Sequence, residues 1–159
     1  MKRQVKAADE PQEVVRLSRN LRAPRVRVFE AFASAASLKQ WLCPLAFTVP
    51  AAEADFRVGG RYRITMRGPD AKIHVVGGRY AEIRRPELVV FTWMWEPDNE
   101  LAGVETTVRV ELEARGAETM LVMTHAGLPT EKARASHTDG WTSTWEHLAQ
   151  VVEGAGKEA

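Results

Sequence analysis

The feature that most constrains the fold of this chain is a change in the spacing of its apolar residues. From Arg61 to His125, apolar residues recur at every second position, which is the period of a half-buried strand. From Thr130 to about Glu153 they recur at helical spacing, so one stripe of a long helix is apolar. Consecutive strands with short connections favour an antiparallel meander. The sequence therefore predicts an α+β domain with a long C-terminal helix packed on an antiparallel sheet.

Strands and two short helices are predicted along the chain. The strands lie in residues 13–21, 60–67, 72–84, 86–97, 103–116 and 117–128. A first helix begins after Pro24, whose missing N–H costs nothing in a first turn. A second, shorter helix takes Ser37 as its N-cap and ends at Pro44. The Gly77-Gly78 pair predicts a bulge or bend inside the strand at 72–84.

Length and charge limit the organisation and the partners. The 159 residues fit one domain with one core. We place a polar N-terminal tail at residues 1–13, a single domain at 14–153 and a C-terminal tail at 154–159. The 22 Lys and Arg residues against 21 Asp and Glu residues leave a net charge of +1. No nucleic acid is expected as a partner, because binding to phosphates depends on an excess of basic residues.

Cysteine and histidine spacing argues against a metal or cofactor. Cys43 is the single cysteine, and the sequence contains no His-x-His, His-Glu-x-x-His or Cys-x-x-Cys pattern. No Gly-x-Gly-x-x-Gly fingerprint for a dinucleotide is present. The N-terminal residues lack the apolar segment of a secretory signal, and the apolar runs are too short for membrane insertion. We therefore expect a cytoplasmic protein without metal or cofactor.

Seven stretches of the chain resemble the motifs of a known family. In order, they are "APRVRVFEAF", "LKQWLCP", "DFRVGGRYRITMRGPD", "GGRYAEI", "LVVFTWMW", "LVMTHAGLP" and "GWTSTWEHL". They look like the successive motifs of the activator of heat-shock-protein-90 ATPase homologue family, within the START-like (SRPBCC) superfamily. This resemblance implies the helix-grip fold, in which a curved antiparallel sheet wraps around the long C-terminal helix, with two short helices after the first strand. It also implies a cavity between helix and sheet.

The stretch "FTWMWE" supplies the candidate apolar wall of that cavity. Alternation in a strand places Phe91, Trp93 and Trp95 on one face. In a helix-grip fold this face meets Trp141 and Trp145 of the long helix. The rings either fill the interior or line a pocket. Our leading hypothesis is that the protein binds a small hydrophobic or aromatic molecule, with Trp93, Trp95, Trp141 and Trp145 as the apolar wall.

Four polar residues are candidate contacts for such a ligand. His125 ends the inward-facing apolar series of its strand, and His137 lies one helical turn before Trp141. Tyr80 and Glu82 are in phase with each other, so a concave location places a carboxylate near aromatic rings, which suits acid–base chemistry. Each has a structural alternative: an interior histidine with satisfied hydrogen bonds, a histidine on the helix surface, or a solvated strand residue.

Two other functions remain open at this point. One is an enzyme of the cyclase or hydrolase kind that uses His125 or Glu82 as general base. The other is a protein-interaction module, as the family name suggests, although a chaperone partner is not favoured because the co-chaperone of the family has an additional N-terminal domain. Leu88, Val90 and Met94 are expected on the outer face, where an apolar patch favours a homodimer unless the tail or a loop covers it.

Overall fold

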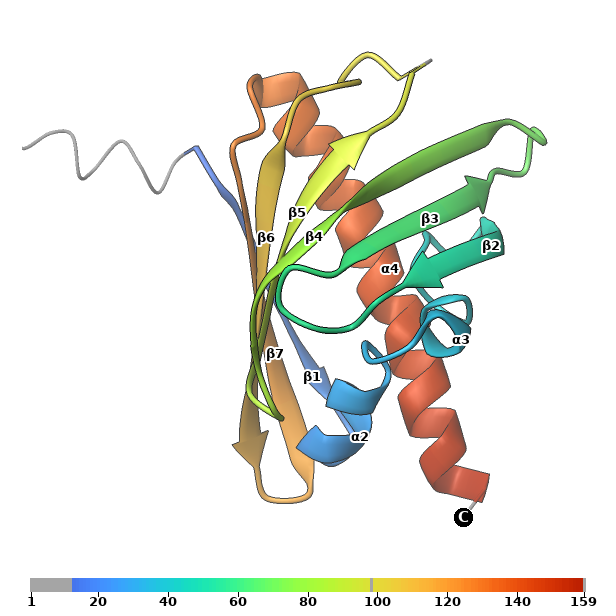
Figure 1. Cartoon of the computed structure of the whole chain (residues 1–159). Helices are drawn as coiled ribbons and strands as arrows, with labels where there is room; N and C mark the ends of the chain where they lie inside the picture. The colour runs from blue at the N-terminus through green and yellow to red at the C-terminus, as the bar shows by residue number, and fades with distance from the viewer. Residues whose placement is uncertain (1–12, 98, 159) are drawn as a thin grey trace, which may run out of the picture.

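The computed structural model describes residues 13–97 and 99–158. Its elements, in chain order, are β1 (Val15–Leu21), α2 (Arg25–Glu30), α3 (Ala35–Leu38), β2 (Thr48–Ala54), β3 (Arg61–Arg67), β4 (Ile73–Arg84), β5 (Leu88–Trp95), β6 (Thr106–Arg115), β7 (Glu118–Ala126) and α4 (Glu131–Glu158). The strands form one sheet in the order β1-β7-β6-β5-β4-β3-β2, and neighbouring strands are antiparallel. Figure 1 shows α4 running along one face of this curved sheet. The predicted helix-grip fold is confirmed.

Strict alternation of side chains gives the sheet one apolar face. In β6, the residues at 106, 108, 110 and 112 are buried and those between them are exposed. In β7, Leu121, Met123 and His125 are fully buried. Because this face turns towards α4, it covers the helix stripe that includes Trp145 and Leu148, which are also buried. One continuous core therefore lies between helix and sheet.

The long helix begins at a cap and continues without interruption. The Thr130 hydroxyl oxygen accepts a hydrogen bond from the backbone N–H of Ala133 at 3.0 Å, which satisfies one of the free N–H groups of the first turn. Gly140 causes no break, and a Cβ added there meets no atom within 4 Å. The helix also passes the boundary predicted at Glu153 and ends at Glu158. Within the described residues, no helix is long and apolar enough to cross a membrane.

Two local predictions near the N-terminus were wrong. The N-cap of α3 is Ser34, whose hydroxyl accepts from the N–H of Ser37 at 3.1 Å, so Ser37 lies inside the helix. The edge strand β2 was missed because its sequence, TVPAAEA, contains Pro50 and several alanines, which are poor strand formers. Proline is tolerated there because an edge strand leaves some of its N–H groups without a ladder partner.

The predicted irregularity in β4 exists, but it lies at Ala81 and not at the glycine pair. Gly77 and Gly78 pair regularly with β3. The pairing with β5 shifts between Tyr80 and Glu82, so Ala81 is the additional residue of a bulge. The glycine at position 78 is required for a different reason. A Cβ at this position lies 2.2 Å from the backbone oxygen of Thr92, a distance that excludes any side chain. Because of the bulge, Tyr80 faces the core and Glu82 faces outward.

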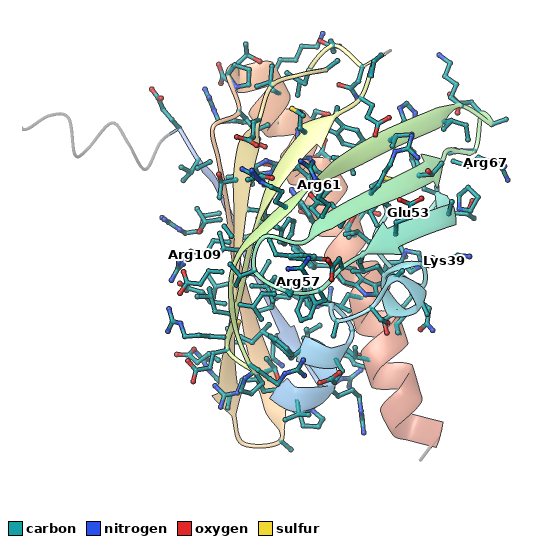
Figure 2. All side chains as sticks on the ribbon, viewed as in Figure 1. Lys39, Glu53, Arg57, Arg61, Arg67 and Arg109 are labelled. Atoms are coloured by element: carbon teal, nitrogen blue, oxygen red, sulfur yellow. The ribbon has the colours of Figure 1, made fainter. Side chains whose placement is uncertain are left out.

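The outer face of the sheet is covered by charged side chains, including those of Arg61 and Arg109 (Figure 2). Several arginines pair with a glutamate two residues away on the same strand. These pairs are Arg84–Glu82, Arg109–Glu111 and Arg115–Glu113. Such exposed pairs contribute only about 0–1 kcal/mol each to stability. Their effect is to keep this face polar.

The predicted apolar patch on the outer face is smaller than expected. Leu88 is 2% exposed and Val90 is 9% exposed, whereas Met94 is 39% exposed. Leu88 lies in register between Arg84 of β4 and Glu111 of β6. Of the three residues, Met94 alone offers substantial apolar surface. The homodimer that the patch suggested stays a prediction.

Candidate functional site

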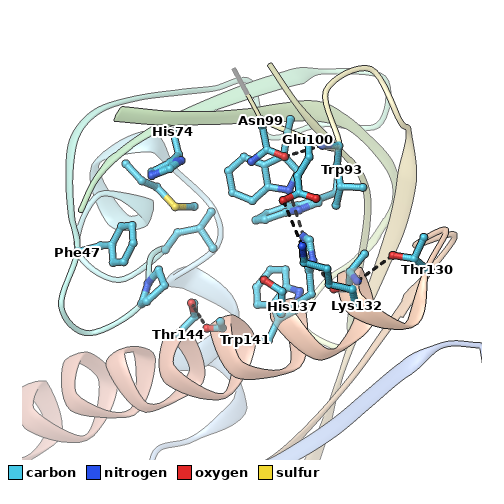
Figure 3. Close-up of a pocket in the computed structure, with 18 residues that line it drawn as sticks. Phe47, His74, Trp93, Asn99, Glu100, Thr130, Lys132, His137, Trp141 and Thr144 are labelled. Atoms are coloured by element: carbon cyan, nitrogen blue, oxygen red, sulfur yellow. Dashed lines mark hydrogen bonds and ion pairs between the residues drawn. The ribbon is translucent and has the colours of Figure 1, made fainter. Parts of the chain in front are cut away.

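A cavity of about 330 Å³ lies between α4 and the open end of the sheet (Figure 3). The sheet contributes Met66 of β3, His74 of β4, and Trp93 and Trp95 of β5. The segments before β2 and after β5, and the residues around the start of α4, complete the wall. Their contributions are Leu42, Pro44, Phe47, Asn99, Glu100, Leu101 and Thr130. The cavity is therefore built from segments that are far apart in the sequence.

One face of α4 forms the floor of the cavity. The residues concerned are Lys132, Ala133, Ser136, His137, Gly140, Trp141 and Thr144. They follow the spacing of three and four residues that places side chains on one helix face. Gly140 lies in the middle of this stripe. Because it has no side chain, the cavity extends down to the helix backbone at that point.

The five tryptophans form a continuous chain of ring contacts that explains where the interior is full and where it is open. Ring centroids are 5.8 Å apart for Trp41–Trp145, 4.9 Å for Trp145–Trp141, 4.8 Å for Trp141–Trp93 and 5.5 Å for Trp93–Trp95. Trp41 and Trp145 are almost completely buried and fill one end of the interior. At the other end, Trp93, Trp95 and Trp141 line the cavity. The tryptophans thus both fill and wall the interior.

His125 is held at the centre of a buried hydrogen-bond network. The indole N–H of Trp141 donates to Nδ1 of His125 at 3.0 Å. Nε2 of His125 lies 2.7 Å from the hydroxyl of Thr106, which in turn donates to the backbone oxygen of Trp93 at 2.8 Å. Because Nδ1 accepts, Nε2 carries the proton and donates to Thr106. His125 is therefore neutral, and neither ring nitrogen is free for a ligand or for proton transfer.

His137 lines the cavity, but both of its nitrogens are also engaged. Its Nε2 accepts from the indole N–H of Trp95 at 3.1 Å, and its Nδ1–H donates to the backbone oxygen of Ala133 at 2.9 Å. Burial lowers the pKa of His137, although the hydrogen bond to Ala133 acts in the opposite direction. His137 therefore fixes the ring of Trp95 at the cavity wall in its neutral form.

The buried state of His125 predicts a dependence of stability on pH. Burial lowers its pKa to about 3, and His137 acts in the same direction. In the unfolded chain, histidine accepts a proton near pH 6.5, so protons bind preferentially to the unfolded state below about that pH. Stability is complete above that pH and falls as the pH decreases towards 3, by about 1.4 kcal/mol per pH unit for this group.

Urea unfolding of the wild type and of His125→Gln at several pH values between about 7 and 5 measures this effect. We expect the free energy of unfolding of the wild type to decrease more steeply with acidity than that of the variant, because glutamine does not titrate. The carboxylates of the two proteins contribute equally and cancel in the comparison. Equal slopes contradict the predicted linkage.

The structure brings half of the predicted site residues together. Trp93, Trp95, His137 and Trp141 line the cavity, whereas Tyr80, Glu82, His125 and Trp145 do not. Glu82 was predicted near aromatic rings, but the bulge turns it outward, where it pairs with Arg84 at 2.9 Å. Tyr80 packs in the core against the rings of Phe56 and Tyr62. As seen from the cavity, Trp145 lies behind Trp141. The two rings are stacked, with an angle of 15° between their planes.

Sequence reasoning missed the wall that comes from outside the regular elements. Leu42, Pro44 and Phe47 connect α3 to β2, and Asn99 and Glu100 follow β5. Periodicity carries no information about such segments. The helical stripe that includes Ala133, Ser136 and Gly140 was detectable, because these residues share a face with His137 and Trp141. Small residues on that face are the signal that the helix borders open space.

The described part of the chain shows neither a metal-binding cluster nor an activated cysteine. Within residues 13–97 and 99–158, no group of three or more His, Cys, Asp or Glu side chains is arranged to hold a metal ion. Cys43 is buried, and burial raises the pKa of its thiol to about 11. His147 is 3.8 Å from its sulfur, but a thiol with this pKa is protonated at neutral pH and a weak nucleophile. What the site offers is shape and apolar surface.

Comparison with solved structures places the fold among bacterial proteins. A protein from Chromobacterium violaceum is 29% identical, with a TM-score of 0.77 over 89% of this chain and 98% of that one. A Silicibacter pomeroyi protein that bears the family's name is 28% identical, with a TM-score of 0.78 over 88% of this chain and 97% of that one. An Arthrobacter aurescens protein is 20% identical, with a TM-score of 0.78 over 92% of this chain and 89% of that one. This likeness shows the fold.

Comparison with models of protein families shows which family the chain belongs to. No protein with a curated function is similar enough in sequence to count as a match. The model described as "Activator of Hsp90 ATPase homolog 1-like protein" matches residues 22–153, which is most of the chain and includes every element from α2 through the cavity-lining part of α4. The chain therefore belongs to the family of Activator of Hsp90 ATPase homolog 1-like proteins.

Proposed function

We propose that this protein binds a small, largely apolar molecule in the cavity between α4 and the sheet. The observation that carries the proposal is the cavity itself, whose volume is about 330 Å³ and whose wall includes three indole rings. Small-molecule sites are mostly apolar clefts of about 300–1,000 Å³ with a few oriented polar groups. The cavity lies at the small end of that range, which suits a compact molecule with one or two rings.

Two features favour binding over catalysis. The general bases suggested by the sequence do not reach a ligand, because His125 is enclosed by Trp141 and Thr106 and Glu82 lies on the outer face. The histidine that does line the cavity, His137, uses both nitrogens within the protein. A general base must lie within hydrogen-bond distance of the proton that it removes. A rigid, mostly apolar wall is instead suited to recognition by shape.

Native mass spectrometry on freshly purified protein and isothermal titration calorimetry with naphthylmethanol test the proposal together. Naphthylmethanol is a neutral, two-ring probe that matches the apolar character of the wall. We expect saturable binding of one probe molecule per chain, or a reproducible additional mass retained from the cell. Absence of both, for protein that unfolds cooperatively, contradicts the proposed function.

A further inference from the structure

The polar groups of the cavity are concentrated at one end. Figure 3 shows Asn99, Glu100, Thr130 and Lys132 together on one side of the cavity, while Phe47 lies on the opposite side. The apolar part of the lining also includes Leu42, Pro44 and Met66. His74 and Thr144 are the exceptions at that end (Figure 3): the His74 ring lies against Phe47 with centroids 6.0 Å apart, and the Thr144 hydroxyl donates to the backbone oxygen of Gly140 at 2.8 Å. The cavity is therefore amphipathic along its length.

At the polar end, most of the acceptor atoms are already used within the protein. Oδ1 of Asn99 accepts from the N–H of Leu101 at 2.8 Å, and the Thr130 oxygen accepts from the N–H of Ala133 at 3.0 Å. Nε2 of His137 accepts from Trp95. What is left over are donors: the amide hydrogens of Asn99 and the hydroxyl hydrogen of Thr130. A ligand group that accepts hydrogen bonds therefore finds donors here that no described residue uses.

One further donor points the same way. Lys132 provides an ammonium group at the mouth of the cavity, where its side chain is 84% exposed. The indole N–H groups of Trp93 and Trp145 are buried without an acceptor among the described residues, but Trp145 does not line the cavity, so these two groups do not bear on the ligand.

The carboxylate of Glu100 is the charged acceptor at this end, and it does not reverse the preference. It lies 4.0 Å from Nζ of Lys132, and its own side chain is 80% exposed. An ion pair this long and exposed contributes little, so a ligand carboxylate displaces Glu100 from Lys132 at small cost. A ligand cation pairs with Glu100 and is repelled by Lys132 in the mirror-image way, so the preference for an acceptor rests on the neutral donors of Asn99 and Thr130 beside Lys132.

We infer that the natural ligand carries an anionic acceptor group of the carboxylate type, which binds at the end formed by Asn99, Thr130 and Lys132. Its apolar body then lies against Trp93 and Phe47. The inference rests on the proposed function, because it assigns an orientation and a chemical class to a molecule bound in that same cavity.

Three matched naphthalene compounds test the inference. Naphthoate carries a carboxylate, naphthylmethanol a neutral hydroxyl and naphthylmethylamine a cation, on the same ring system. We expect calorimetry to show naphthoate binding at least about fivefold more tightly than the amine, with the alcohol between them. We also expect the affinity for naphthoate to fall with added salt, since the attraction to Lys132 is screened.

Substitutions at the polar end locate the effect. Lys132→Met is expected to weaken naphthoate binding by about two- to fivefold, and Glu100→Gln to strengthen it by a similar factor, with the alcohol unaffected in both. Lys39→Met serves as the control, because it removes the same charge from an exposed position that does not line the cavity. It is expected to leave all three affinities unchanged.

The outcomes separate this inference from the proposed function. Binding of the alcohol without preference for naphthoate overturns the inference and leaves the proposed function standing. A preference for naphthoate that Lys132→Met does not reduce also overturns it. If none of the three compounds binds, the inference falls, and the proposed function falls with it when no additional mass is retained from the cell either.

Discussion

In the Gly140→Leu variant, binding of naphthylmethanol weakens by about tenfold or more, while the melting temperature of the protein rises. Both effects follow from the place of Gly140 in the middle of the cavity floor. The leucine side chain occupies space that the ligand needs, and no atom within 4 Å obstructs its Cβ. Glycine in a helix interior costs about 1 kcal/mol relative to alanine, and leucine recovers most of that difference. Calorimetry and thermal unfolding measure the two effects separately.

Gly154→Leu is the matched control for this experiment. Gly154 belongs to the same helix and does not line the cavity, and a Cβ added to it also meets no atom within 4 Å. We expect it to raise the melting temperature as well and to leave naphthylmethanol binding unchanged. If Gly140→Leu binds the probe as well as wild type does, the ligand lies elsewhere.

The second large effect is expected at His125. His125→Leu is predicted to lower the free energy of unfolding by about 2–4 kcal/mol, because it leaves the indole N–H of Trp141 buried without an acceptor. The hydroxyl of Thr106 loses its contact with the ring at the same time. Urea unfolding at neutral pH measures the loss.

A double-mutant cycle distinguishes loss of the hydrogen bond from loss of packing. Trp141→Phe removes the donor, and the cycle with His125→Leu isolates the interaction between the two side chains, which we expect to be about 1–3 kcal/mol. Met123→Leu, two residues away on the same buried face, preserves volume and should cost less than about 1.5 kcal/mol. A coupling energy near zero shows that the hydrogen bond between Trp141 and His125 does not stabilise the fold.

Periodicity was sufficient to predict most of the strands and the long helix, and the family resemblance supplied their arrangement as a helix-grip fold. The alternation in β6 and β7 and the helical stripe around Trp145 and Leu148 both reflect burial of one face, which is the same physical cause that sets the fold. The placement of Trp93, Trp95 and Trp141 in one interior followed from that fold, which the resemblance implied. The role of these residues in binding a ligand remains a prediction.

The errors arose where one residue changes the outcome. The bulge at Ala81 reverses the facing of Glu82, and nothing in its composition distinguishes Ala81 from a regular strand residue. The bulge was predicted at the glycine pair instead, although the close approach of the Thr92 backbone explains why residue 78 is a glycine. Phe47 and Glu100 could not be assigned to the cavity, because their positions depend on how connecting segments fold over the sheet, which local spacing does not encode.

The chain of indole contacts from Trp41 to Trp95 has an optical consequence. Because each ring lies within 6 Å of the next, excitation of any one tryptophan passes readily to its neighbours before emission. Emission is therefore shared by the set, and polarised excitation loses its orientation as energy moves along the chain. A quencher that touches Trp95 at the cavity therefore also lowers the emission of the buried tryptophans to which Trp95 is linked.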